Sequence, residues 1–200
     1  MSESNINLLM WAHYSNHDGF LVNFKLESLK SKFQFIFPMN YVDTLPNLII
    51  PNKPLKFMIS TNLKSTMWRY EREWRLYYQS SPMLLPELSN SFRNMNEEWI
   101  YKNSRTPKER KVKYEISDIN FVTLGYKFIL GEEHDKINSD TILLNLKDNY
   151  KLTLVDYLIE KDIPIRMITY GDVSEFGLKD FPIKIKKIES EFKYELKYIV

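Results

Sequence analysis

Hydrophobic and polar positions alternate with a period of two along several short segments of the chain, which is the pattern of a half-buried β-strand. The alternation is strictest in YEREWRLYY, residues 70–78, where it places Glu71, Glu73 and Arg75 on one face of the expected strand. Strand composition also marks residues 20–26, 33–42, 111–116, 121–129 and 163–170. These segments predict a sheet in which one strand has a charged face.

Other segments have apolar residues at helical spacing. Residues 5–16 predict a short helix that Asn5 can cap, and residues 152–161 predict a second helix. Residues 140–146 also predict a helix, and a weaker helical pattern covers 55–67. The tail, 183–200, fits an edge strand pair and an amphipathic helix equally well. Strands and helices together indicate an α+β fold, a single mixed and mostly antiparallel sheet with flanking helices.

The length of 200 residues predicts one domain over residues 1–200, because two smaller domains would each bury too small a core. Residues 80–110 are polar and are interrupted by Pro82, Pro86 and Pro107. We expect this stretch to be an insertion or a mobile lid, with a helix over residues 96–102 inside it.

Composition narrows the classes of function. The chain has no cysteine, which excludes disulfides, zinc ribbons, iron–sulfur sites and a thiolate nucleophile. No apolar run approaches the roughly 20 residues needed to cross a bilayer, so we expect a cytoplasmic protein without a membrane partner. The net charge of +2 offers little general attraction to nucleic acid.

The first candidate site is the string LMWAHYSNHDGF, which contains Trp11, His13, Tyr14 and His17. On a helix the two histidines project to the same side, a spacing that can hold a divalent metal when a third ligand is present. The glutamate of an H-E-x-x-H motif is missing, and we expect no metal. Two interpretations stay open: the residues cap and pack a helix end, or they stack on and hydrogen-bond a nucleotide.

The second candidate site is the charged strand face with Glu71, Glu73 and Arg75. Residues two apart on a strand lie side by side, so these side chains form a row that either pairs in solvent or lines a cleft. Trp68 and Trp74 flank the row. Apolar walls increase the influence of a half-buried carboxylate, which favours the cleft.

Four strings in order resemble the bacterial family called domain of unknown function 2971. They are LMWAHYSNHDGFLVNF from Leu9, KSTMWRYEREWRL from Lys64, ISDINFVTLG from Ile116 and IPIRM from Ile163, so the resemblance spans about residues 8–169. Family members typically begin with segments like L-Y-K-Y-R and F-N-D-P, which do not precede these strings here. The resemblance therefore implies that an N-terminal segment or a partner chain supplies them.

The family in turn is distantly similar to the ADP-ribosyltransferases of the DarT type, which implies an ADP-ribosyltransferase-like fold with NAD as a candidate substrate. By this comparison Glu73 is the catalytic candidate and Glu71 is secondary. Trp11, His13, Tyr14, His17 and Arg75 are the candidate NAD-binding residues. The resemblance implies a toxin or phage-defence setting and keeps nucleic acid as a candidate acceptor; the alternative is a non-catalytic binding or regulatory module that retains the fold.

Overall fold

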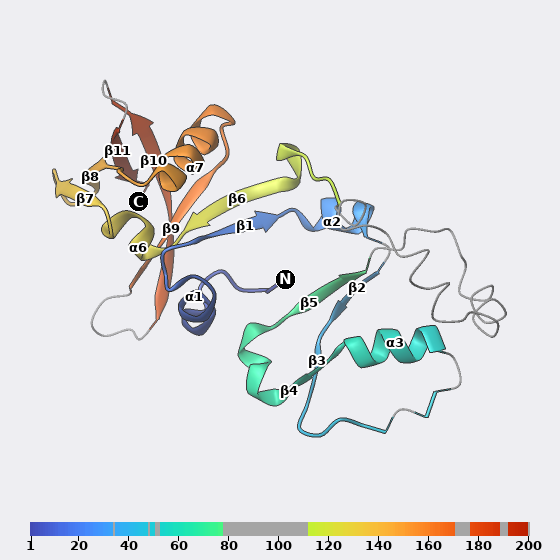
Figure 1. Ribbon diagram of the computed structural model, residues 1–200. Helices are drawn as coiled ribbons and strands as arrows, with labels where there is room; N and C mark the ends of the chain where they lie inside the picture. The colour runs from blue at the N-terminus through green and yellow to red at the C-terminus, as the bar shows by residue number, and fades with distance from the viewer. Residues whose placement is uncertain are drawn as a thin grey trace. The chain divides into compact units, whose positions relative to one another are not determined.

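The computed structural model describes residues 1–33, 35–47, 49–50, 53–77, 112–170, 177–188 and 192–199. The chain folds into two compact units (Figure 1). Unit 1 comprises Met1–Glu3 and Leu29–Tyr114, and unit 2 comprises Ser4–Ser28 and Glu115–Val200. The expectation of one domain over the whole chain stays a prediction.

Unit 2 is built on a seven-stranded sheet with the strand order β1-β6-β9-β10-β11-β8-β7 (Figure 1). The strands are β1 (Phe20–Phe24), β6 (Ile119–Leu124), β7 (Glu133–Lys136), β8 (Thr141–Asn145), β9 (Ile165–Tyr170), β10 (Leu178–Lys187) and β11 (Lys193–Tyr198). Only the β6–β9 pair is parallel, and the other five neighbouring pairs are antiparallel. This sheet confirms the predicted fold class, a mixed and mostly antiparallel sheet with flanking helices.

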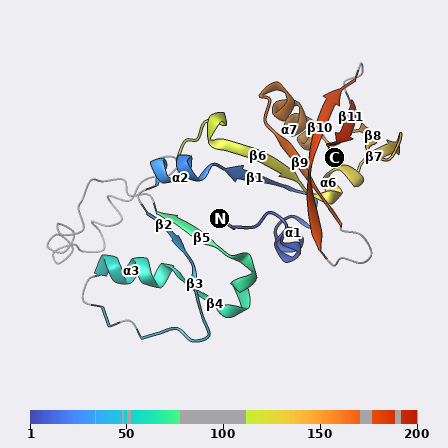
Figure 2. The same cartoon turned by 180° about the vertical axis from the view of Figure 1, so that it is seen from behind.

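The main core of unit 2 lies between this sheet and two helices, α6 (Tyr126–Leu130) and α7 (Asn149–Glu160). Val155 and Leu158 of α7 and Phe128 of α6 are buried against strand residues such as Leu144 and Leu196. In the views of Figure 1 and Figure 2, α7 lies beside β10. A smaller cluster joins Trp11 of α1 (Leu8–Ser15) to Ile168 and Leu178.

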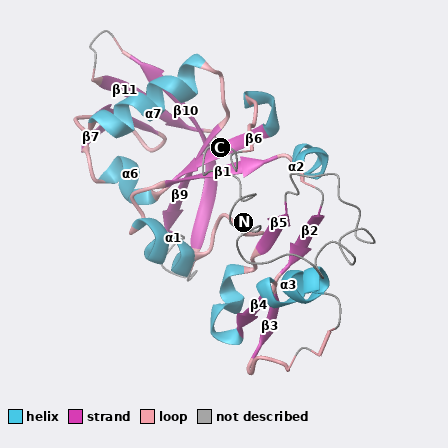
Figure 3. Ribbon diagram, turned by 45° about the vertical axis from the view of Figure 1, so that its right-hand side comes forward, coloured by secondary structure: helices cyan, strands magenta, loops and turns pink. Residues whose placement is uncertain are grey.

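The described residues of unit 1 form two separate pairs of strands (Figure 3). In one pair β2 (Phe35–Pro38) runs antiparallel to β5 (Trp74–Tyr77), and in the other β3 (Asn40–Val42) runs parallel to β4 (Leu63–Ser65). The helix α3 (Lys53–Thr61) precedes β4, and a 3₁₀ helix, η1 (Thr66–Glu71), follows it. The helix α2 (Leu26–Lys32) begins in unit 2 and ends in unit 1.

Several predicted elements are confirmed with shorter bounds. Strands β1 and β9 and helix α7 lie where the periodicity placed them. Helix α1 begins later than predicted, because Asn7 and not Asn5 accepts the capping hydrogen bond, from the Met10 N–H at 3.1 Å. The Asn5 carbonyl instead accepts a hydrogen bond from the Trp11 indole at 2.6 Å.

Other predictions were wrong. Within 140–146, Thr141–Asn145 form strand β8 and not a helix, because β7 and β11 pair with it on both sides. The tail forms strands β10 and β11, but both are interior and neither is an edge. Residues 112–115 form no strand. The segment with the weak helical pattern, 55–67, is divided among α3, β4 and η1. Helix α2 was not predicted.

The strand predicted over 70–78 is also shorter. Tyr70 and Glu71 end η1, and Arg72 has a left-handed backbone conformation with φ of 45°, so β5 begins only at Trp74. The segment predicted over 121–129 ends as a strand at Leu124, and Gly125 caps the start of α6. The predicted lid over 80–110 and its helix lie outside the described residues. In the part of the chain that is described, no helix is long and apolar enough to span a membrane.

Candidate functional site

The predicted carboxylate pair meets at Lys64 of β4. The Lys64 ammonium donates a hydrogen bond to Glu71 Oε2 and another to Glu73 Oε2, the latter at 2.9 Å. Glu71 ends η1 and Glu73 precedes β5, and the left-handed turn at Arg72 lies between them. This turn brings both carboxylates to one lysine although they do not share a strand face.

Arg75 completes the cluster. Its Nε donates to Glu73 Oε1 at 3.0 Å, and its Nη1 donates to the Thr61 carbonyl oxygen. Both carboxylate oxygens of Glu73 are therefore hydrogen-bonded, and two of the three guanidinium nitrogens have acceptors within the protein. The Glu73 backbone N–H donates to the Tyr41 hydroxyl at 2.8 Å, which fixes the start of β5.

These contacts keep Glu73 and Lys64 ionised. Burial by itself raises the pKa of the Glu73 carboxyl, but the hydrogen bonds from Lys64 and Arg75 outweigh burial and hold this pKa below its ordinary value. Burial likewise favours a lower pKa for Lys64, and its hydrogen bonds to Glu71 and Glu73 raise the pKa above its ordinary value. At neutral pH Glu73 is a carboxylate and Lys64 is an ammonium.

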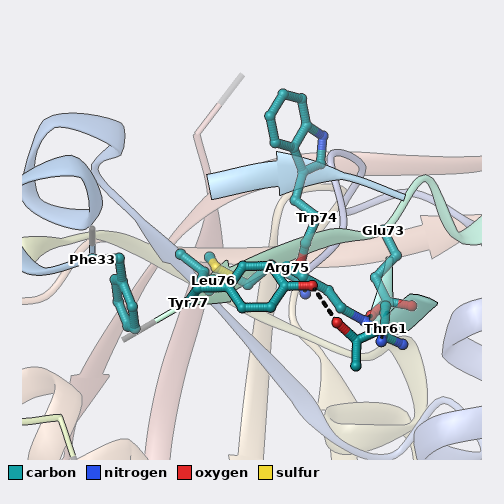
Figure 4. Close-up of a pocket in the computed structure, with 8 residues that line it drawn as sticks. Phe33, Thr61, Glu73, Trp74, Arg75, Leu76 and Tyr77 are labelled. Carbon is teal, nitrogen blue, oxygen red and sulfur yellow. Dashed lines mark hydrogen bonds and ion pairs between the residues drawn. The ribbon is translucent and has the colours of Figure 1, made fainter. Parts of the chain in front are cut away.

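Glu73 borders a pocket of about 570 Å³ within unit 1 (Figure 4). The residues that line it include Phe33, Trp74, Arg75 and Tyr77, and in Figure 4 the Trp74 indole points away from the side chains of Arg75 and Tyr77. The hydroxyls of Thr61 and Tyr77 hydrogen-bond to each other at 3.0 Å, as the dashed line in Figure 4 marks. The Glu73 side chain is 20% exposed and that of Glu71 only 3%, so Glu73 is the more accessible carboxylate.

The other predicted site residues lie in unit 2. Trp11 and Tyr14 both line a second pocket, of about 160 Å³, beside α1 and β1. Trp11 is buried, Tyr14 is 67% exposed and His13 is exposed. Their predicted role in binding NAD stays a prediction.

His17 lies beyond the end of α1, with a left-handed φ of 64°, so it does not share a helix face with His13. Its ring is buried against Tyr126, with a centroid distance of 5.1 Å. Burial, followed by the charge of Lys127, lowers the pKa of His17, so its imidazole is neutral at pH 7. No group of three His, Asp or Glu side chains suited to a metal occurs among the described residues.

The sequence interpretation missed Lys64, Thr61 and Tyr41 as parts of the carboxylate cluster. Lys64 begins the string KSTMWRYEREWRL, so its presence in that string was the available signal. Thr61 contributes a backbone carbonyl and Tyr41 a hydroxyl from β3, and neither has a sequence pattern that indicates this role.

Comparison with known proteins supports the family resemblance over one part of the chain. A model of the family described as protein of unknown function (DUF2971) matches residues 10–76 of the 200. The matched stretch includes Trp11, His13, Tyr14 and His17 and the complete cluster of Lys64, Glu71, Glu73 and Arg75. No curated protein and no solved structure matches the chain.

Proposed function

We propose that the pocket of unit 1 is the site of an ADP-ribosyltransferase-like domain in which Glu73 is the functional carboxylate. The observation that supports this proposal is a carboxylate held ionised at the wall of an aromatic-lined pocket. Glu73 also occupies the place in the E-W-R-L string that resembles the transferase glutamate. The resemblance adds a toxin or phage-defence setting to the proposal.

The residues of the pocket suit part of NAD as a substrate. A volume of about 570 Å³ lies within the usual range for small-molecule sites. Phe33 and Tyr77 offer flat apolar surfaces to a nicotinamide or adenine ring, and the Glu73 carboxylate offers acceptors to ribose hydroxyls. The pyrophosphate needs a cation whose donors are available, and two of the Arg75 nitrogens are already engaged. We therefore include in the proposal an additional N-terminal segment or a partner chain that holds the pyrophosphate.

The proposed reaction breaks the bond between the ribose C1′ and the nicotinamide nitrogen. Nicotinamide leaves with the bonding electron pair, and positive charge develops on the ribose ring. A carboxylate at this place stabilises that charge more in the transition state than in the ground state. An acceptor nucleophile, or water, then bonds to C1′ and loses a proton to solvent or to Glu73. Transfer to water makes the same site an NAD glycohydrolase.

A non-catalytic binding module is the second candidate, and a specific contact favours it. Lys64 and Arg75 hydrogen-bond both oxygens of Glu73, so the protein already neutralises this carboxylate. A reaction that uses Glu73 requires at least one of these cations to shift toward the substrate. If neither shifts, the cluster is a structural ion-pair network around a ligand pocket.

Glu73→Gln separates the two functions. The substitution keeps the size of the side chain and removes its charge, so catalysis predicts a loss of NAD turnover of about 100-fold or more with a small change in melting temperature. Glu71→Gln is the comparison and should reduce turnover much less, because Glu71 is only 3% exposed. Product formation is measured by mass spectrometry with labelled NAD and protein or nucleic-acid acceptors. If both variants lose the same small amount of NAD turnover, or if the loss of turnover is explained by unfolding, the result would favour the non-catalytic module.

A further inference from the structure

Residues Met1–Glu3 lie in unit 1 and run beside the start of β5. Ser2 pairs with Glu73 in an antiparallel bridge. The Trp74 N–H donates a hydrogen bond to the Met1 carbonyl oxygen at 2.7 Å, and the Met1 ammonium donates to the Trp74 carbonyl oxygen at 2.9 Å. Because directly opposite residues of two paired strands lie on the same face, Ser2 lies across from the candidate carboxylate. We call Met1–Glu3 the strap.

Side chains of the strap also bind the segment that carries the two glutamates. The Trp74 indole N–H donates to Glu3 Oε1 at 2.6 Å, and the Glu3 backbone N–H donates to the Arg72 carbonyl oxygen at 3.3 Å. The Ser2 hydroxyl donates to the Glu71 carbonyl oxygen at 2.7 Å. The strap is therefore held by hydrogen bonds to the turn between η1 and β5 and to the first residue of β5.

The strap also forms part of the pocket that Glu73 borders. Met1 is one of the residues that line this pocket. Burial lowers the pKa of the Met1 ammonium, whereas the nearby charge of Glu73 acts to raise it. The ammonium thus lies close enough to interact with the carboxylate, and the strap borders the pocket on the side of Glu73.

The contacts of the strap favour a segment that can leave its place. Met1 and Glu3 are exposed and Ser2 is half-buried, so apolar burial adds little to its attachment. Each hydrogen bond replaces one to water and has a small net effect, while ordering three residues costs conformational entropy. The docked and released states of the strap therefore lie close in free energy, and release leaves the pairing of β5 with β2 intact.

We propose that the strap is a removable wall of the pocket. Docked on β5, it shields Glu73 with Ser2 and Met1; released, it opens this side of the pocket to a ligand. A ligand that enters from this side competes with the strap, so its affinity is reduced by the fraction of molecules in which the strap is docked. The strap acts on any ligand of the pocket, and only an effect on NAD turnover would rest on the proposed function.

Two backbone amides of β5 report on the strap and on the sheet separately. The Trp74 N–H faces the strap. Successive residues of an antiparallel strand direct their N–H groups to opposite sides, so the Arg75 N–H faces β2, where Arg75 pairs with Phe37. Release of the strap frees the Trp74 N–H and leaves the Arg75 N–H paired, whereas unfolding of unit 1 frees both.

The test measures hydrogen exchange of both amides by NMR in the complete 200-residue chain, whose intact mass confirms that Met1 is present. In the wild type the Trp74 amide should exchange faster than the Arg75 amide, because the strap opens without unfolding. Glu3→Pro removes the N–H that bonds Arg72 and the carboxylate that holds the indole. Exchange at Trp74 should then rise by about ten-fold or more, with exchange at Arg75 unchanged within about two-fold.

Access to Glu73 is measured in the same proteins by coupling accessible carboxyl groups to glycine ethyl ester with a carbodiimide, followed by mass spectrometry of peptides. Glu73 should be labelled about three-fold faster or more in Glu3→Pro, since the released strap no longer shields it. Glu133, whose side chain is 64% exposed, should be labelled at the wild-type rate in every variant. The labelling requires no NAD, so its outcome does not depend on the proposed function.

Glu3→Gln is the matched control, because it keeps the backbone N–H and an amide oxygen that accepts a hydrogen bond from the indole. Its exchange and labelling rates should stay within about three-fold of the wild type. Circular dichroism checks that each variant is folded. In Glu3→Pro, an equal rise of exchange at Trp74 and Arg75, or no rise at either, would overturn the proposal. Faster exchange at Trp74 without faster labelling of Glu73 would also overturn it, since the released strap would then not open the pocket.

Discussion

At the residue scale, Lys64 decides the character of the candidate site. It donates hydrogen bonds to two carboxylates, Glu71 and Glu73, and lies beside the Trp68 ring. One Glu71 oxygen accepts a hydrogen bond from Lys64, and the Glu71 side chain is only 3% exposed. Glu73 accepts hydrogen bonds from both Lys64 and Arg75 and borders the pocket. The two glutamates therefore differ in role: Glu71 mainly stabilises the cluster, and Glu73 is accessible to a ligand.

We predict that Glu71→Ala destabilises the protein by about 2 kcal/mol, because it removes a buried partner of Lys64 and leaves a void. The value lies below that for a fully buried pair, since Glu73 still pairs with Lys64. The measurement is urea unfolding followed by circular dichroism. Glu133→Ala is the matched control, as it breaks the exposed pair with Lys147 and should leave the unfolding midpoint nearly unchanged. A similar effect of the two substitutions would contradict the structural role of Glu71.

The same cluster predicts how stability depends on pH. The pKa of Glu73 is lowered in the folded protein. The Glu73 ion pairs therefore contribute fully to stability above pH 4.5, the ordinary pKa of a glutamate, and this contribution is lost as the pH falls through the lower pKa of the folded protein. The pKa of Lys64 is raised, so its contribution is complete below its ordinary value of 10.5 and is lost only above it. Lys64→Met should therefore lower the melting temperature most between pH 6 and pH 9.

That difference between wild type and Lys64→Met should shrink steadily below about pH 4.5, as the glutamate is protonated. Calorimetric melting temperatures between pH 3 and pH 9 provide the check. A difference that is constant down to pH 3 would mean that the ion pairs contribute nothing and that Lys64 acts through packing of its side chain alone.

At the element scale, two turns of unit 2 fit closely against each other. The turn between α1 and β1 has left-handed residues at Asn16 and His17, and its His17 carbonyl accepts a hydrogen bond from the Lys127 N–H at 3.0 Å. Gly125 lies at the other turn, between β6 and α6, and its N–H donates to the Gly19 carbonyl at 2.9 Å. A Cβ atom on Gly125 would lie 2.3 Å from the His17 carbonyl oxygen, so only glycine fits there.

We predict that Gly125→Ala destabilises unit 2 by about 2 kcal/mol, since the contact is with backbone atoms that cannot rotate away. The measurement is the midpoint of thermal unfolding monitored by far-ultraviolet circular dichroism. Lys184→Ala, at an exposed position of β10, is the control and should change the midpoint little. An unchanged midpoint for Gly125→Ala would show that the two turns separate at little cost.

At the scale of the whole molecule, the family match and the two units do not coincide. The matched residues 10–76 begin in unit 2, where they form α1 and β1, and continue into unit 1, where they form the carboxylate cluster. The remaining strands of the seven-stranded sheet, from β6 to β11, lie outside the match. Family resemblance thus covers the candidate site residues more completely than it covers the sheet.

We predict that the chain alone binds NAD with a Kd above roughly 100 μM, which corresponds to a binding free energy weaker than about −5.5 kcal/mol. The physical reason is that Lys64 and Arg75, the cations nearest to Glu73, already donate to protein acceptors. Isothermal titration calorimetry gives the affinity, with ADP-ribose as a second titrant. A micromolar Kd would show that one of these cations exchanges its partner for the pyrophosphate.

Local sequence patterns were enough to locate three elements, although two of them, β1 and β9, pair with a strand that lies far away in sequence. The strand composition of 20–26 and 163–170 predicted β1 and β9, and the apolar spacing in 152–161 predicted α7. Glu73 and Arg75 were predicted to be neighbours because they are two residues apart at the start of an extended segment, and they do hydrogen-bond. In each case the physical cause acts over a few residues, so the sequence alone contains it.

Features that depend on contacts between distant segments were decided only by the tertiary structure. The pairing of β8 with β7 and β11 overrides the helical pattern of 140–146, because ladder hydrogen bonds and burial outweigh weak local propensity. Lys64 reaches both glutamates only because β4 pairs with β3 and the chain turns at Arg72.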